Sequence, residues 1–267
     1  MRRLGRRTSC AALALALLVC SRPVVAQTAA PADPLRPAVE FLPRVAFDLS
    51  AEHLSGDDVT FVWDMNFGGE LDVIDYRVGR ATFVANYQTI LGDEFRHFDP
   101  NQGNYILGGS VSFRTRGVEL AGVFHHESRH LSDRANRVAV AWNMVGGRAR
   151  RAFTVGRAHV DARVDLRGVV AKAFVDYDWE IDSGVRSDVQ IRPGIGALVA
   201  LGLRRLAVDG SQNRGDQTGY RGEVGVRVDG RAGAMEFFVA AERRVDPYPL
   251  EFGVARWVTV GFRVLSQ

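Results

Sequence analysis

Apolar and polar residues alternate along almost the whole chain after residue 42, and this alternation restricts the fold more than any other feature. In the first such segment Val45, Phe47 and Leu49 share one face, whereas Asp48 and Ser50 share the other. A period of two residues is that of a β-strand with one apolar face, and no segment shows the capped 3.6-residue period of a helix. The sequence therefore predicts an all-β protein.

The alternating segments are long and evenly spaced. They are predicted at approximately residues 43–54, 58–68, 78–91, 104–115, 118–129, 135–146, 152–166, 169–182, 187–206, 218–229, 233–244 and 252–265. This gives about twenty residues per strand and turn, as in transmembrane barrels, and an even number of strands closes a sheet without an unpaired edge in lipid. Aromatic residues near strand ends, such as Trp63 and Trp257, favour a barrel over a soluble β-sandwich. We therefore predict an antiparallel transmembrane β-barrel of about 12 strands.

The connections between these strands differ in length on the two sides of the predicted barrel. Tight turns are expected on the periplasmic side, at 116–117 and near 183–186 and 229–232. The longer connections, expected on the extracellular side, are 92–103, 207–217 and 245–251.

Residues 1–26 have the features of a secretory signal peptide. Arg2 and Arg3 belong to a basic start, an apolar run follows from Cys10 to Cys20, and small residues precede Gln27. Cleavage there leaves a periplasmic lead-in at 27–42 and a barrel domain at 43–267. No later apolar run reaches the roughly 18–20 residues of a membrane helix, so the predicted location is the bacterial outer membrane, reached through its assembly machinery.

Composition excludes several classes of function. Both cysteines lie in the leader, so the exported chain has no disulfide, thiol nucleophile or cysteine-based metal site. The leader also holds five of the 34 basic residues and none of the acidic ones. The rest of the chain therefore carries 29 basic against 31 acidic residues, and nucleic acid is not an expected partner.

Polar residues interrupt the apolar face of one predicted strand. Continuing the phase of Leu120 and Phe124 puts His126 and Ser128 on the apolar face, whereas His125 goes to the opposite face with Glu127. In the next strand, Asn136 shares its phase with Val138, Val140, Trp142 and Met144. Asn136 is thereby predicted to share the apolar face, across from His126 or Ser128. Such conflicts between residue type and local pattern are typical of functional sites.

These three side chains can fill the roles of a serine hydrolase. Serine needs a base to take its proton, imidazole can do so, and a third group holds the imidazole in the right tautomer. We therefore predict Ser128 as nucleophile, His126 as general base and Asn136 as orienting residue, with His130 and Asp133 as alternatives for the last role. On a lipid-facing surface, this array would meet ester bonds at headgroup depth.

The pattern of His126-x-Ser128 high on a barrel strand, followed by Asn136-Arg137, resembles the outer-membrane phospholipase A family. The lipid A 3-O-deacylase family shares the lipid-facing His-x-Ser, and an uncharacterised outer-membrane family carries His-x-Ser-Ser-His-x-Gly-Asp, which residues 126–133 resemble in spacing. The chain departs from the phospholipases at Arg129-His130, where they have Asn-Gly. The resemblance implies hydrolysis of acyl esters in phospholipid or in the lipid A of lipopolysaccharide.

Two other functions remain open on the sequence. The polar residues could simply lie among headgroups in a barrel that anchors or scaffolds, or the lumen could conduct small solutes. Mixed charges on the predicted inner face, such as Glu119, Arg163 and Arg221, should however pair across a narrow lumen.

A cofactor is not required by any motif. Asp93, Glu94 and Asp99 could hold a calcium ion, which prefers carboxylate oxygens, or they could belong to a solvated loop.

Overall fold

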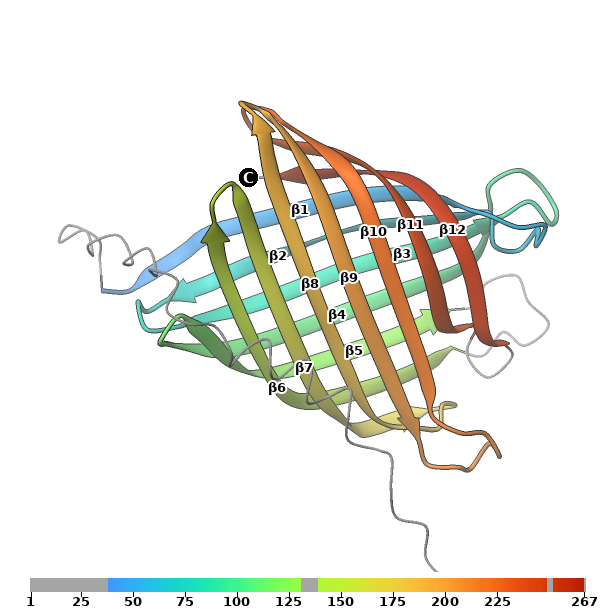
Figure 1. Ribbon diagram of the computed structural model, residues 1–267. Helices are drawn as coiled ribbons and strands as arrows, with labels where there is room; N and C mark the ends of the chain where they lie inside the picture. Colours follow the sequence, from blue (N-terminus) through green and yellow to red (C-terminus); the bar gives the residue numbers. More distant parts are fainter. Residues whose placement is uncertain (1–37, 131–138, 249–251, 267) are drawn as a thin grey trace, which may run out of the picture.

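The computed structural model describes residues 38–130, 139–248 and 252–266, and within them twelve strands form one closed antiparallel barrel (Figure 1). Each strand pairs with its neighbours in sequence, and the pairing of β1 with β12 closes the sheet. The strands are β1 (Glu40–Leu54), β2 (Trp63–Asp75), β3 (Arg80–Gly92), β4 (Asp99–Thr115), β5 (Val118–His130), β6 (Val140–Val155), β7 (Ala158–Ala173), β8 (Tyr177–Arg192), β9 (Ile195–Val208), β10 (Gln217–Asp229), β11 (Gly233–Tyr248) and β12 (Phe252–Ser266). The predicted fold class is confirmed. In the part of the chain so described, no helix is long and apolar enough to cross a membrane.

The two ends of the barrel differ, and we call them the turn end and the loop end. β1 begins and β12 finishes at the turn end, where adjacent strands are joined by two to four residues (Figure 1). At Arg116 and Gly117 both φ angles are positive, 48° and 78°, as a tight hairpin turn requires. The loop end carries longer connections, such as 55–62 and 209–216.

Several predicted boundaries are wrong. The strands expected at 152–166 and 187–206, for example, each contain a turn of the actual barrel, at 156–157 and 193–194. The turn expected near 183–186 lies inside β8, and the actual turn is at 193–194. The strand expected at 169–182 instead spans the end of β7, the connection 174–176 and the start of β8. Alternation continues through this hairpin connection, so the period alone does not mark where the chain reverses.

The outer face of the barrel is apolar around its circumference. Many large apolar side chains point outward and are exposed, among them Val45, Phe83, Val111, Phe124, Leu166, Leu201, Val224, Phe237 and Val260. A continuous exposed belt of this kind on a closed barrel favours contact with lipid.

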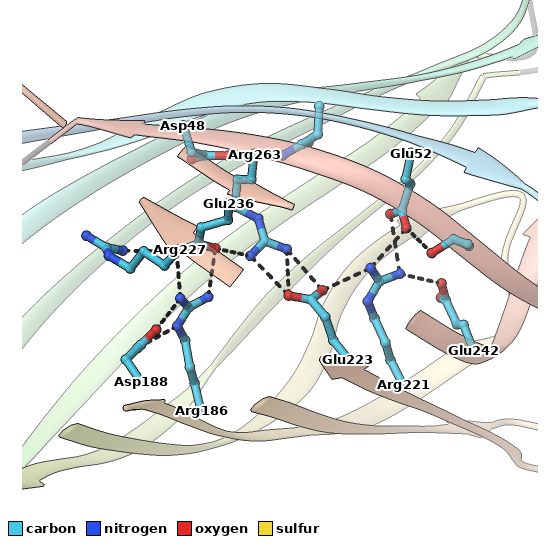
Figure 2. A network of polar contacts seen from close by, with 12 residues as sticks. Asp48, Glu52, Arg186, Asp188, Arg221, Glu223, Arg227, Glu236, Glu242 and Arg263 are labelled. Atoms are coloured by element: carbon cyan, nitrogen blue, oxygen red, sulfur yellow. Dashed lines mark hydrogen bonds and ion pairs between the residues drawn. The ribbon is translucent and has the colours of Figure 1, made fainter. Parts of the chain in front are cut away.

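Ion pairs line and cross the lumen (Figure 2). Glu236 is fully buried and accepts hydrogen bonds from Arg186, Arg227 and Arg263. Arg263 also reaches Glu223, at 3.1 Å. The mixed charges of the inner face therefore pair across the lumen, as predicted.

Toward the loop end the lumen contains an apolar cluster. Trp142 and Met144 of β6 are fully buried there, in a cluster with Tyr177, Leu206 and Val245. Their positions correct the predicted facing of the sixth strand, which put Trp142 and Met144 on the lipid side. An apolar side chain satisfies the same period whether it meets lipid or a packed interior, so alternation did not distinguish the two faces.

Candidate functional site

Strand β5 presents different chemistry on its two faces. His126 and Ser128 lie on the outer face, half-buried, in phase with exposed Phe124. His125 points into the lumen, where its ring contacts Arg167 at 3.1 Å and Glu127 at 3.8 Å. The structure thus places both sequence-predicted residues on the lipid-facing surface.

His126 has an asparagine partner on the adjacent strand β6. Asn143 lies directly across from His126, and the distance from His126 Nδ1 to Asn143 Oδ1 is 2.8 Å. An amide oxygen only accepts hydrogen bonds, so in this contact the N–H group at Nδ1 donates a hydrogen bond to Asn143 Oδ1. In the neutral tautomer that makes this contact, Nε2 carries no proton, which is the form that a general base needs.

Sequence reasoning missed Asn143 because it assigned β6 to the wrong face. Residue numbers of cross-strand partners on β5 and β6 have an odd sum, as in Ser128 with Ala141, whereas the prediction required an even sum. The odd residues of β6 therefore share the outer face with the even residues of β5. A lone Asn between the large apolar residues Trp142 and Met144 was the available signal.

Of the other predicted orienting residues, the described part of the chain includes His130. Asn136 and Asp133 lie outside the described residues, so their roles stay predictions. His130 is on the outer face, but its ring packs edge-on against Tyr105, with centroids 5.3 Å apart.

Ser128 is flanked by an aromatic residue on one side and a small one on the other. Its cross-strand neighbours are Tyr105 of β4 and Ala141 of β6. The structure records no hydrogen bond between Ser128 and His126, which are both described, and such contacts often tighten only around substrate. Ser128 itself is partly exposed on this outer face.

The strand that carries these residues is held from inside the barrel. Glu127 accepts hydrogen bonds from Arg129 at 2.9 Å and from Arg204 at 3.3 Å. Arg129 also donates to the backbone carbonyl of Asp246 on β11, at 2.6 Å. These buried contacts lie at positions that alternate with His126 and Ser128, so they restrain the backbone between them.

The acidic residues considered for calcium do not form a metal site. Asp99 accepts from Arg96 at 3.1 Å, and Asp93 accepts from the backbone N–H of Phe98 at 3.2 Å. Within residues 38–130, 139–248 and 252–266, no group of three or more His, Cys, Asp or Glu side chains could hold a metal ion.

Comparison with known proteins identifies the fold. No known protein family and no curated protein matches this sequence. An active-site mutant of outer membrane phospholipase A from Escherichia coli matches the structure with a TM-score of 0.51 and 11% identity, over 89% of this chain and 94% of that chain. The outer membrane phospholipase dimer of Salmonella typhi with bound calcium matches with a TM-score of 0.50 and 12% identity, over 89% and 94%. The chain has the fold of an outer-membrane β-barrel.

A porin is also among the solved structures that match. The KdgM porin matches with a TM-score of 0.47 and 8% identity, over 83% of this chain and 98% of that chain. At these identities the comparisons show the fold alone, so function must be argued from the site itself.

Proposed function

We propose that this protein is a serine-type hydrolase of acyl esters in phospholipid or lipid A, acting from the lipid-facing surface of a bacterial outer-membrane barrel. One observation carries the proposal: on the outer face, the His126 ring is held by Asn143 at 2.8 Å, two residues along the strand from Ser128. Polar side chains are costly on a lipid face, and this group supplies a base, its orienting residue and a nucleophile.

The reaction follows from the tautomer of His126. Ser128 Oγ attacks the ester carbonyl carbon while His126 Nε2 takes the hydroxyl proton, and the carbonyl π electrons move to oxygen. When the carbonyl re-forms, the ester C–O bond breaks and the leaving alkoxide takes the proton from His126. Water then attacks the acyl-serine by the same proton path, which releases a fatty acid and restores Ser128.

The location of the site suits a substrate that stays in the membrane. His126 and Ser128 lie near the loop end of β5, which is the extracellular end if both termini are periplasmic. An ester at headgroup depth could reach Ser128 without leaving the bilayer. Membrane lipids or lipopolysaccharide are therefore the proposed partners, besides the machinery that assembles outer-membrane barrels.

Lipid analysis tests the activity directly. We expect purified wild-type protein in vesicles of phosphatidylethanolamine, phosphatidylglycerol and lipopolysaccharide to release fatty acids, and mass spectrometry would identify the cleaved lipid. Turnover of none of the three, by protein that shows a folded barrel on heat-modifiable electrophoresis, would instead favour an anchoring or scaffolding barrel.

The Asn143→Ala variant is expected to lower kcat by about 10-fold to 100-fold with little change in KM, because a general base contributes roughly 10²–10⁴-fold and Asn143 only orients it. The measurement is steady-state hydrolysis of the lipid that mass spectrometry identifies. Asn136→Ala serves as the comparison. If Asn136→Ala lowers kcat and Asn143→Ala does not, the orienting role belongs to Asn136.

We expect the wild-type barrel to show no steady conductance across planar bilayers. Ion pairs such as Arg186–Glu236 join β8 to β11 across the lumen at 2.6 Å, and the apolar cluster around Trp142 packs inside its loop end. A stable open current would favour the small-solute channel over a closed barrel.

A further inference from the structure

The proposed reaction places a negative charge beside Ser128, and the described part of the strand offers no spare backbone donor for it. An acyl-ester hydrolase stabilises the carbonyl oxyanion with hydrogen-bond donors aimed at its position. Ser128 is paired with Tyr105 on one side and with Ala141 on the other. Arg129 is likewise paired on both sides. The backbone N–H groups of both residues are therefore used by the sheet, so the described side chains around Ser128 are the candidate donors.

Few outer-face side chains around Ser128 can donate a hydrogen bond. Ala141, its neighbour on β6, has no polar atom. Asn143 lies across from His126, and along β6 it is two residues further from the loop end than Ala141. Tyr105 lies directly opposite Ser128, and opposed Cβ atoms on adjacent strands are about 4.5–5.5 Å apart.

The Tyr105 ring is held in place by neighbouring rings. It packs against Tyr87 with centroids 4.9 Å apart and against His130 at 5.3 Å. Tyr87 in turn packs on Phe67 at 5.4 Å, so a row of rings crosses β2, β3 and β4 and ends beside Ser128. A ring fixed in this way loses little freedom when its hydroxyl binds a ligand.

The hydroxyl of Tyr105 is accessible and uncommitted. Tyr105 is 48% exposed, and the structure records no hydrogen bond to its hydroxyl from any described residue. Tyr87, by contrast, lies over Gly103, where its hydroxyl would be 2.8 Å from an added Cβ. The two tyrosines share the row and the outer face, but only Tyr105 borders Ser128.

We propose that Tyr105 is a catalytic residue, whose phenol donates a hydrogen bond to the oxyanion of an acyl ester attacked by Ser128. This inference rests on the proposed function and adds a donor to it. The phenol only donates a hydrogen bond to the ester oxyanion, and no proton is transferred between them.

The test removes one hydroxyl at a time. We expect Tyr105→Phe to lower kcat by about 10²–10³-fold, the usual loss for one oxyanion donor, with KM changed less than about threefold. Tyr87→Phe is the matched control and should keep wild-type kinetics. The substrate is p-nitrophenyl palmitate in detergent micelles, and heat-modifiable electrophoresis checks that each variant forms a barrel.

A second measurement separates catalysis from packing. The rate at which an alkyl fluorophosphonate labels Ser128 should fall in Tyr105→Phe and not in Tyr87→Phe, because the phosphoryl oxygen takes the oxyanion position. If Ser128→Ala is inactive and Tyr105→Phe retains kcat within threefold of wild type, the Tyr105 proposal is wrong and the hydrolase stands. If wild type and Ser128→Ala are equally inactive or equally active, both proposals fail.

Discussion

Ser128→Ala and His126→Ala are each expected to lower kcat by about 10³-fold or more, while the barrel still forms. The first variant removes the nucleophile and the second removes the general base, whose contribution is roughly 10²–10⁴-fold. The double variant should be no worse than either single one, because the two residues act as a unit. Folding should persist, since both side chains lie on the outer face, away from the lumenal ion pairs.

Matched substitutions distinguish this effect from general disturbance of the outer surface. Ser187 of β8 also lies on the outer face, between exposed Val185 and Val189, so Ser187→Ala should leave kcat unchanged. His125→Ala should likewise leave activity nearly unchanged, because its ring faces Arg167 in the lumen. A set of variants in which His125 is required and His126 is not would contradict a lipid-facing site.

Glu236→Ala is expected to destabilise the barrel by about 3–5 kcal/mol, the usual cost of removing one partner from a buried ion pair. Its carboxylate is 0% exposed and pairs with Arg186 at 2.6 Å, Arg263 at 2.8 Å and Arg227 at 2.9 Å (Figure 2). Without it, three guanidinium groups stay close together inside the barrel. Urea unfolding of protein inserted in vesicles measures the change.

An exposed carboxylate provides the comparison. Asp216 pairs with Arg205 at 2.8 Å near the loop end, where both side chains are more than a third exposed. Asp216→Asn should therefore cost less than about 1 kcal/mol. Similar costs for Asp216→Asn and Glu236→Ala would mean that water screens the lumenal ion pairs.

The period-two pattern determined the fold class and one face of the site. It identified an antiparallel barrel and put His126 and Ser128 opposite His125 and Glu127, because side chains of an uninterrupted strand must alternate. These features depend on neighbours in sequence alone. They were therefore accessible without knowledge of how strands pair.

Strand pairing decided what the pattern left ambiguous. Whether Trp142 meets lipid or a packed interior depends on residues such as Tyr177 and Val245, which are distant in sequence and adjacent only in the closed barrel. The same pairing turned Asn143 outward and set it across from His126. A one-residue change in facing moves every side chain of a strand to the other surface. The sequence alone thus determined which strand carries the candidate site, whereas the register between β5 and β6, a long-range property, decided which asparagine contacts it.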